Sequence, residues 1–454
     1  MAPADEAPVN IGSEKQLFVD DYLVDEVRDL RLSVHQWEKH LANPVIIADR
    51  PWESDDTVLV YGGALYDEDE GVFKIWYWSY NDDDETMLYA VSDDGITWEK
   101  PELDVYRFED MRTNVVMASE PGGRNMETYG AMQCPWDPDP GGLYKTCFWE
   151  ARPDGRRGVW TATSPDGIHW TKSEAPICDE AGDTVGFYYD DLAERYVCFV
   201  KLHTDRGRSR AQLESENFED WTEPRLIMKT DDRDDHPCQL YNNSGFIWGS
   251  MRLGFVQTYY LHEHPYQSRL ELELMYSRDG QKWQRMPNRE PVLQVGDDGS
   301  WDRTNQSQMS GAPIVVGDRM YTYYGGRTYY HPPYEGGDRS CSIGLATMRL
   351  DGFVSRDASP MGGYLTIRPL IFEGDRLHVN VKSDYGHCRV EVLDEDFEPV
   401  EGYSADDADD VCADSVDRVV TWKGNSEIGG ATNQPVRLRF HLQNARLYAF
   451  WIDG

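Results

Sequence analysis

Lysine is scarce in this chain: of its 454 residues, 11 are lysine and 33 are arginine. The 44 basic residues are outnumbered by 82 acidic ones, which gives a formal net charge of −38. Nucleic acids and anionic membranes are bound by basic surfaces, so this deficit argues against both as partners. The sequence also has no run of about 18 apolar residues, the length needed to cross a bilayer. We therefore expect neither a nucleic-acid nor a membrane partner.

Residues 1–15 lack the basic segment and apolar run of a signal peptide, which predicts a cytoplasmic protein. None of the eight cysteines forms a C-x-x-C pair, so a zinc ribbon or a thioredoxin-like site is not expected. Cys147 and Cys198 lie in apolar runs and are predicted to be buried free thiols. This cysteine usage fits a reducing compartment.

The acidic residues are spread along the whole chain and are not gathered in a tail. One interpretation is a catalytic or metal-binding cluster of acids. The other is a halophilic cytosol, where hydrated carboxylates keep a protein surface solvated in concentrated salt, and where high net charge is common. The even spread, together with the replacement of lysine by arginine, favours a halophilic origin.

Helical periodicity is nearly absent, and short runs rich in Val, Tyr, Trp, Phe and Thr alternate with Asp-Gly and Gly-Gly. This pattern predicts an all-β chain. A repeat with the core S-x-D-G-x-x-W follows a strand at residues 87–100, 159–172 and 272–284. Degenerate copies lie at 210–223 and 343–355. Asp-Gly suits a tight hairpin turn, and we expect the Trp of each copy to pack between neighbouring sheets.

Five copies at this spacing predict a five-bladed β-propeller, with residues 1–358 as the propeller. The alternative is a β-sandwich with recurring hairpins. In the first blade we expect strands at 57–66, 72–80, 86–92 and 96–100. We expect residues 30–37 to pair with the last blade and close the ring. Residues 359–454 alternate apolar and polar positions in short strands and predict a small C-terminal β-sandwich.

Several segments carry a resemblance to known proteins, among them LFVDDYLV (17–24), YAVSDDGITWEKP (89–101) and GSWDRTNQSQMSGAPIVVGDRMYTYYGG (299–326). They are similar to a bacterial group that resembles the N-terminal propeller of glycoside hydrolase family 32. The resemblance implies a furanosidase-like superfamily that also holds family 43, with five blades and carboxylates in an axial funnel. The chain lacks the W-M-N-D-P-N, R-D-P and E-C motifs of family 32, so no catalytic residue is carried over from it.

Inner strands of a propeller converge on one funnel, so carboxylates that begin the inner strands are expected to lie close together. Glycoside hydrolysis usually needs two of them, one as a protonated acid and one as a nucleophile or base. We expect Asp183 and Asp302 to be essential, with Glu53 or Glu127 as a third catalytic residue. The competing interpretation is a solvated acidic loop or a strand cap.

The same strand starts offer side chains that could stack on a sugar ring or bind its hydroxyls. A lone His is more often structural, and an Arg beside a Glu can be a surface pair. The predicted substrate-binding residues are Trp52, Arg124, Asp235, His236, Gln239, Trp301, Arg303 and Gln308. No metal ligand is assigned and no cofactor is required, although so many oxygens are compatible with a structural divalent cation such as Ca²⁺.

The sequence therefore predicts a glycoside hydrolase-like enzyme that cleaves a furanoside or a small oligosaccharide with funnel carboxylates. A first alternative is a glycoside phosphorylase, whose phosphate would be held by Arg206, Arg208 and Arg303. A second is a non-catalytic carbohydrate-binding protein, since a fold shared with enzymes does not establish an enzyme.

Overall fold

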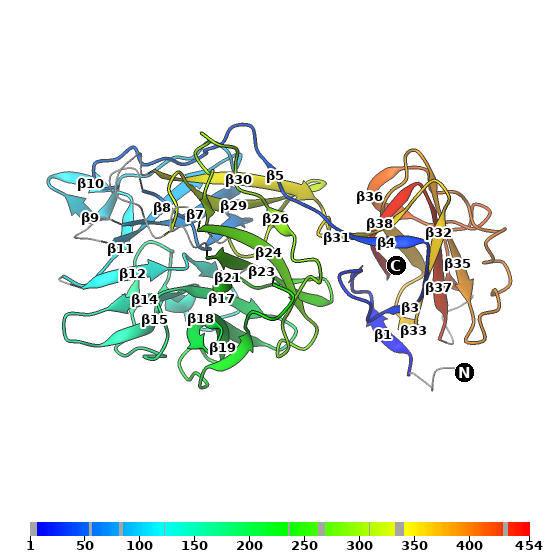
Figure 1. Ribbon diagram of the computed structural model, residues 1–454, viewed down its shortest axis with the longest axis horizontal. Helices are drawn as coiled ribbons and strands as arrows, with labels where there is room; N and C mark the ends of the chain where they lie inside the picture. Colours follow the sequence, from blue (N-terminus) through cyan, green and yellow to red (C-terminus); the bar gives the residue numbers. More distant parts are fainter. Residues whose placement is uncertain are drawn as a thin grey trace.

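The structure is a computed structural model. It describes residues 7–53, 57–80, 85–121, 123–234, 237–261, 268–307, 309–331, 340–429 and 435–454. Within these ranges the chain is all-β, as the sequence predicts: there is no α-helix, only a 3₁₀ turn, η1 (Pro140–Gly142). Figure 1 shows a larger body built from the middle of the chain and a smaller body that contains the C-terminus.

The first three sheets of the larger body are antiparallel and follow one another along the chain. In the first, β11 (Val115–Ala118), β8 (Glu85–Ser92), β7 (Val72–Tyr80) and β6 (Ala64–Asp67) pair in that order. Residues 96–100, expected as its outermost strand, contribute only the bridge between Glu99 and Val91. A separate hairpin joins β9 (Leu103–Phe108) and β10 (Met111–Thr113).

The second sheet contains β12 (Arg124–Thr128), β13 (Met132–Gln133), β14 (Tyr144–Ala151), β15 (Arg157–Ser164) and β16 (Thr171–Lys172). The third contains β17 (Val185–Asp190), β18 (Arg195–Thr204), β19 (Gly207–Ser215) and β20 (Arg225–Met228).

The fourth and fifth sheets are linked by one parallel pair, Leu270 with Asn305. The fourth contains β21 (Cys238–Asn243), β22 (Phe246–Trp248), β23 (Met251–Tyr260), β24 (Arg269–Ser277), β25 (Gln284–Arg285) and β26 (Pro291–Leu293). The fifth contains β27 (Asn305–Gln306), β28 (Ile314–Val316), β29 (Arg319–Arg327), β30 (Cys341–Arg349) and, at its edge, β5 (Glu38–Lys39).

Hydrogen bonds and close packing join each of these sheets to the next, and the fifth to the first. A side chain added at Gly62 would collide with Tyr129 of the second sheet. The ring of Tyr129 lies 6.1 Å from that of Phe187 in the third sheet.

Thr184 Oγ1 then donates to the carbonyl oxygen of Tyr241 at 2.8 Å, and the Gln257 amide donates to the carbonyl oxygen of Gln306. Ser307 Oγ, from the fifth sheet, donates to the carbonyl oxygen of Val60 beside the first sheet at 2.6 Å. The five sheets therefore contact one another in cyclic order.

The S-x-D-G turn of the repeat forms part of this closure. Gly95, Gly167 and Gly280 adopt φ values of +72°, +74° and +68°, and in each turn the glycine N–H bonds the preceding serine hydroxyl. Phe218 takes the glycine position in the degenerate copy and also has a positive φ, +66°.

The carbonyl oxygens of the three glycines accept hydrogen bonds from the sheet before. Tyr323 donates to Gly95 at 2.7 Å, Trp76 to Gly167 at 2.7 Å and Gln212 to Gly280 at 2.9 Å. The repeated tryptophan packs across the same junctions, as predicted, since Trp98 lies 5.3 Å from Tyr323 and Trp283 lies 5.4 Å from Phe199.

The smaller body has two main sheets that share one apolar core, which includes Phe18, Val379 and Phe440. One sheet contains β36 (Asp414–Val419), β34 (Arg376–Lys382), β38 (Ala445–Asp453), β31 (Val354–Ala358), β4 (Leu30–Val34) and β2 (Gln16–Leu17). The other contains β3 (Val24–Arg28), β32 (Gly363–Ile367), β37 (Arg437–Gln443) and β35 (His387–Leu393). A further parallel pair joins β1 (Val9–Gly12) to β33 (Leu370–Phe372).

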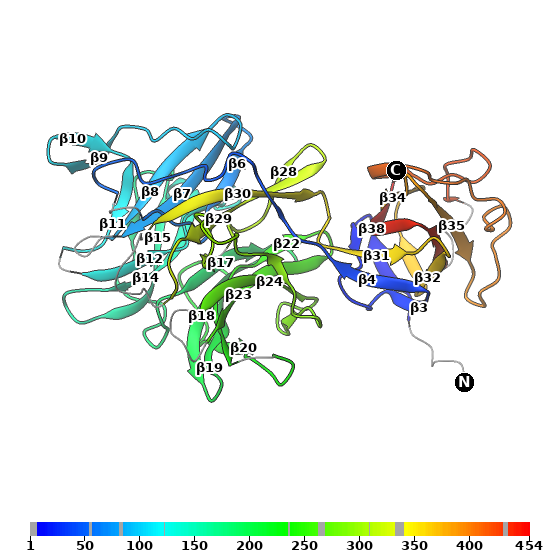
Figure 2. The ribbon, with the colours of Figure 1, turned by 45° about the horizontal axis from the view of Figure 1, so that its top comes forward.

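The N-terminal strands differ from the prediction. Leu30–Val34 pairs with Val354–Ala358, in the smaller body, and does not close the larger one. Instead β5, at Glu38–Lys39, pairs with Ala346 and Thr347 of β30. In Figure 2 the chain passes from β4 in the smaller body back to the larger one. Residues 9–34 thus add strands to C-terminal sheets, a long-range pairing that local periodicity does not encode.

All eight cysteines are free and seven are buried, Cys147 and Cys198 among them, as predicted. In the part of the chain that the structure describes, no helix is long and apolar enough to cross a membrane.

Candidate active site at the strand starts

Polar and charged side chains converge where the first strand of each sheet of the larger body begins. They come from all five sheets and perturb one another electrostatically. We call this group the strand-start cluster; it contains Tyr61, Glu127, Asp183, Lys201, Arg208, Gln239, Tyr241 and Arg327.

Glu127 is the second-sheet member of the cluster. Its neighbours in β12 face the first sheet: Met126 belongs to the core shared with that sheet, and Thr128 Oγ1 lies 3.3 Å from the sulfur of Met87. Because side chains alternate along a strand, the Glu127 carboxyl points the other way, toward the third sheet. Burial raises the pKa of Glu127 to about 7; nearby Glu85 raises it further, and the cations Lys201 and Arg327 oppose the shift.

Lys201 joins the two predicted catalytic carboxyls, Glu127 and Asp183. It lies in β18 beside the start of β17, where its ammonium forms an ion pair with Asp183. The ammonium also interacts with Glu127 and lies 5.2 Å from the centre of the Tyr241 ring. Burial lowers the pKa of Lys201 to about 8, and Glu127 opposes that shift. Lys201 thus lies between Glu127, whose pKa is raised, and Asp183, which is partly exposed and paired with it.

Arg208 contacts two aromatic rings and one amide on the fourth-sheet side of the cluster. Its guanidinium lies 5.4 Å from the ring centre of Tyr241 and 5.3 Å from that of Tyr259. One Nη donates to Oε1 of Gln239 at 3.0 Å. Aromatic rings at this distance attract a guanidinium through cation–π interactions.

Arg327 ends β29 and supplies the fifth-sheet cation. An Nη lies 3.4 Å from the Tyr61 hydroxyl, and the guanidinium lies 5.7 Å from the ring centre of Tyr329. Nearby His331 packs at 5.3 Å against both Tyr241 and Tyr259. Burial and the surrounding cations lower the pKa of His331 to about 3, so its ring is neutral at physiological pH.

Arg210 lies beneath the cluster as a fully buried cation. Its donors bond only neutral oxygens: Oδ1 of Asn243 at 2.6 Å, Oδ1 of Asn242 at 3.2 Å, and the hydroxyl and carbonyl oxygens of Thr184 and the carbonyl of Tyr241 at 3.0–3.3 Å. Burial lowers the pKa of Arg210 to about 9. The side chain ties the third sheet to the fourth and leaves a positive charge under the site.

Of the predicted catalytic residues, the structure brings Asp183 and Glu127 together and places Glu53 and Asp302 elsewhere. Glu53 is buried and satisfied: Lys100 Nζ lies 2.6 Å from its Oε1, and the Tyr77 hydroxyl donates to the same oxygen at 2.7 Å. Asp302 is buried at the edge of the fifth sheet, where Lys39 Nζ lies at 2.5 Å and the Tyr324 hydroxyl at 2.9 Å. Both pairs hold separate parts of the chain together.

Gln239 alone among the predicted binding residues lies in the cluster with its side chain described. Trp52 bonds Asn114 at 2.8 Å, Trp301 packs 5.6 Å from Tyr324, and Arg303 bonds the carbonyl oxygen of Thr328 at 2.9 Å. Asp235, His236 and Gln308 lie outside the described residues, and Arg124 is described only through its backbone in β12.

The three arginines predicted to bind phosphate do not form one group in the structure. Arg206 is exposed and pairs with Asp232 at 2.7 Å. Arg303 pairs with Asp298 at 3.4 Å and bonds the carbonyl oxygen of Thr328, so of the three only Arg208 has described contacts with cluster side chains.

Lys201, Tyr241 and Arg327 were not predicted as site residues, although they complete the cluster. Each lies inside or at the end of a strand and not in a loop before it. One sequence signal was available for Lys201: it is a rare lysine inside the apolar strand RYVCFVKLHT. Among the described residues, no three His, Cys, Asp or Glu side chains gather in a way that could hold a metal ion.

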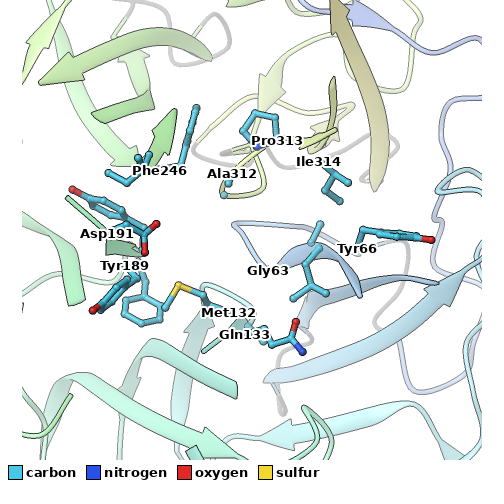
Figure 3. Close-up of a pocket in the computed structure, with 18 of the residues that line it drawn as sticks. Gly63, Tyr66, Met132, Gln133, Tyr189, Asp191, Phe246, Ala312, Pro313 and Ile314 are labelled. Carbon is cyan, nitrogen blue, oxygen red and sulfur yellow. The ribbon is translucent and has the colours of Figure 1, made fainter. Parts of the chain in front are cut away.

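A pocket of about 540 Å³ opens at the other end of the same strands. Figure 3 shows Gly63, Met132, Tyr189, Phe246 and Pro313 around it, one from each sheet. All of these except Pro313 follow a cluster residue of the same sheet by two to six positions along the chain, at roughly 3.3 Å per strand residue. The charged residues that line the pocket are Glu68 and Asp191, with no cation beside them in the described part of the chain. The pocket therefore lacks the acid–cation arrangement of the strand-start cluster.

No protein-family model matches the chain, and no curated protein matches it. Solved structures with partial backbone similarity include an N-acetylgalactosamine deacetylase from F. plautii bound to blood group B trisaccharide, with 15% identity, 72% of this chain and 96% of that one covered, and a TM-score of 0.46. A β-1,2-mannobiose phosphorylase from Listeria innocua has 12% identity, 70% and 99% coverage, and a TM-score of 0.48. A glycosyl hydrolase from Bacteroides ovatus has 15% identity, 70% and 94% coverage, and a TM-score of 0.48. At these values the likenesses assign no activity to the chain, and the resemblance to families 32 and 43 stays a prediction.

Proposed function

We propose that the five cyclically joined sheets are the blades of a β-propeller, and that the smaller body is a β-sandwich completed by the strands of residues 9–34. A propeller brings the starts of its inner strands to one axial site, which accounts for the convergence of residues from all five sheets. Figure 1 is consistent with this arrangement of the larger body.

We propose further that the chain is a carbohydrate-active enzyme that hydrolyses a glycosidic bond at the strand-start cluster. The observation that carries the proposal is the pairing of Glu127, whose pKa is about 7, with Asp183 across Lys201. Glycoside hydrolysis needs one carboxyl that is protonated near neutral pH and a second that is ionised. Burial raises the pKa of the first, and the second forms an ion pair with the ammonium of Lys201.

In the proposed reaction, Glu127 donates its proton to the glycosidic oxygen as the bond from that oxygen to the anomeric carbon breaks. The Asp183 carboxylate either removes a proton from an attacking water or forms the new bond to the anomeric carbon itself. In the second case, water then displaces Asp183 while ionised Glu127 takes the proton. The first route leaves a proton on Asp183, and its transfer through solvent to Glu127 restores both groups. The second route restores both groups directly, because Glu127 takes the proton of the attacking water.

The test is a screen of pentose and hexose glycosides, as furanosides and pyranosides, with detection of the released sugar. Asp183→Asn and Glu127→Gln should each lower turnover of the substrate found by roughly 100-fold or more, while Asp302→Asn should retain its catalytic rate in the folded fraction. Full activity in Asp183→Asn and Glu127→Gln would contradict the assignment. Binding of a sugar without any product would instead favour a carbohydrate-binding protein.

A glycoside phosphorylase is the second candidate, favoured by the concentration of cations at the site. Arg208 and Arg327 could bind inorganic phosphate, which would then attack the anomeric carbon in place of water. Turnover that requires inorganic phosphate and yields a sugar phosphate would establish this candidate, whereas turnover in phosphate-free buffer supports hydrolysis.

A further inference from the structure

Three arginines at the site have no carboxylate partner in the part of the chain that the structure describes. Arg208, Arg210 and Arg327 have no carboxylate oxygen within 4.0 Å, although the protein carries 82 acidic residues. Elsewhere in the described chain Arg157 and Arg418 also lack one, but both are exposed to solvent. The three site arginines are instead buried or half-buried and gather around Tyr241.

Leaving such cations without an ion pair costs free energy unless something else compensates them. Arg210 is compensated by the neutral oxygens that surround it. Arg208 and Arg327 have fewer partners: Gln239 and aromatic rings for Arg208, and the Tyr61 hydroxyl and the Tyr329 ring for Arg327. Both arginines therefore keep N–H groups that can donate hydrogen bonds to a bound anion.

The remaining charges at the site set where an anion can bind. Lys201 is neutralised by Asp183, so it offers little to a ligand. Glu85, whose charge raises the pKa of Glu127, disfavours an anion beside Glu127. The attractive region is therefore the side formed by Arg208 and Arg327, with buried Arg210 below it. Arginine binds a planar carboxylate through paired N–H donors, and the Arg208 guanidinium is held 5.4 and 5.3 Å from the ring centres of Tyr241 and Tyr259.

We propose that the substrate is an acidic sugar whose carboxylate is bound by Arg208 and Arg327. This inference rests on the proposed function and names its substrate class: glycosides of uronic acids. Inorganic phosphate shares the same chemistry, but Asp183 counts against it. A phosphate that attacks the anomeric carbon needs no catalytic base, and the Asp183 carboxylate would repel it there.

The first experiment measures binding, which does not depend on turnover. Titration calorimetry of the full chain compares glucuronate and galacturonate with glucose and galactose, which differ in a carboxylate against a hydroxymethyl group. We expect the acids to bind more tightly. Arg208→Gln should weaken binding of the acid by roughly 10- to 100-fold, the range for a hydrogen bond to a charged group, and should leave the neutral sugars unchanged.

Arg206→Gln is the matched control, because Arg206 lies two residues away in sequence, is exposed and pairs with Asp232. It should bind the acids as the unchanged protein does. Arg208→Lys tests whether charge alone suffices: it should recover part of the affinity lost in Arg208→Gln. Arg327→Gln should act like Arg208→Gln, and circular dichroism checks that each variant is folded.

The second experiment measures turnover of 4-nitrophenyl glucuronides and galacturonides against the matching glucosides and galactosides, with and without inorganic phosphate. Faster release from the uronides in phosphate-free buffer supports the proposal. Tighter binding or faster turnover of the neutral sugars, unaffected by Arg208→Gln, overturns it, as does turnover of neutral glycosides that requires phosphate. If the acids bind through Arg208 but no glycoside is cleaved, the ligand assignment stands and the hydrolase proposal fails.

Discussion

Trp76 in the first sheet donates a hydrogen bond from its indole nitrogen to the carbonyl oxygen of Gly167 in the second, at 2.7 Å. The same relationship joins Tyr323 to Gly95 and Gln212 to Gly280. The S-x-D-G motif thus serves two purposes: it turns the chain within one sheet and presents an acceptor to the sheet before. Junctions made by the turns hold the strand starts in a fixed arrangement.

We predict that Gly167→Ala lowers the thermal midpoint substantially. A Cβ at Gly167 would lie 2.5 Å from the Trp76 ring, and φ is +74° there. Left-handed strain costs about 1–2 kcal/mol and overpacking about 1–3 kcal/mol more. Gly155→Ala is the control, because its φ is +90° but nothing lies within 4 Å of the added carbon. Equal midpoints for the two variants in scanning calorimetry would mean that the contact with Trp76 contributes nothing.

We predict that kcat/KM falls as the pH rises through about 7. Burial raises the pKa of Glu127 to about 7, and the proposed reaction needs its protonated form, so activity is present below this pKa and lost above it. Glu127→Gln should lower kcat by roughly 10²- to 10⁴-fold and remove this limb of the profile. A profile that stays flat between pH 6 and 9 in the unchanged protein would rule out Glu127 as the acid.

We predict that Lys201→Gln moves the same limb to higher pH. Lys201 is a cation that opposes the raised pKa of Glu127, so its removal raises that pKa further. Lys172→Gln is the comparison, since Lys172 pairs with Glu150 at 2.9 Å, outside the cluster. A purely structural role for Lys201 would lower kcat without moving the limb.

We predict that Glu53→Gln destabilises the fold and leaves the pH dependence of activity unchanged. The carboxylate of Glu53 is paired with Lys100 and accepts backbone N–H groups of Asp49 and Arg50 at 2.8 and 3.0 Å. Breaking a buried pair of this kind costs about 3–5 kcal/mol. Chemical denaturation measures the loss, and a shift of the pH profile would return Glu53 to the candidate catalytic residues.

We predict that the thermal midpoint rises with potassium chloride between 0.1 and 2 M. The formal charge is −38, and repulsion among surface carboxylates opposes the compact state. The screening length falls from about 10 Å at 0.1 M to about 3 Å at 1 M, so added salt weakens this repulsion. A midpoint that falls over this range would contradict the interpretation of the charge as an adaptation to salt.

Local patterns in the sequence predict much of the fold. The Asp-Gly turns, the strands that flank them and the packing of Trp98 and Trp283 between sheets all depend on residues close in sequence. The pairing of Leu30–Val34 with Val354–Ala358 depends on contacts across more than 300 positions, and no periodicity signals it.

The site divides in the same way. Glu127 and Asp183 could be predicted, because acids near the start of a sheet's first strand are expected to meet at the centre of a propeller. Glu53 and Asp302 follow the same rule, yet each finds a lysine from a distant segment, Lys100 and Lys39, and is neutralised by it. Lys201 and Arg327 lie on second and later strands, whose alignment beside the first strand becomes visible only in the folded sheets.

Tyr129 has a consequence for which substrates can enter. Its side chain is buried between the first, third and fifth sheets: it packs on Phe187, a side chain at Gly62 would collide with it, and one at Gly311 would come within 2.8 Å of its hydroxyl. It also lines the pocket, and it lies two residues after Glu127 of the strand-start cluster. Under the proposed function, its buried ring would stop a polysaccharide from passing between the cluster and the pocket. We therefore expect a long chain to enter by its terminus and to be cleaved from its tip, as in an exo-acting enzyme.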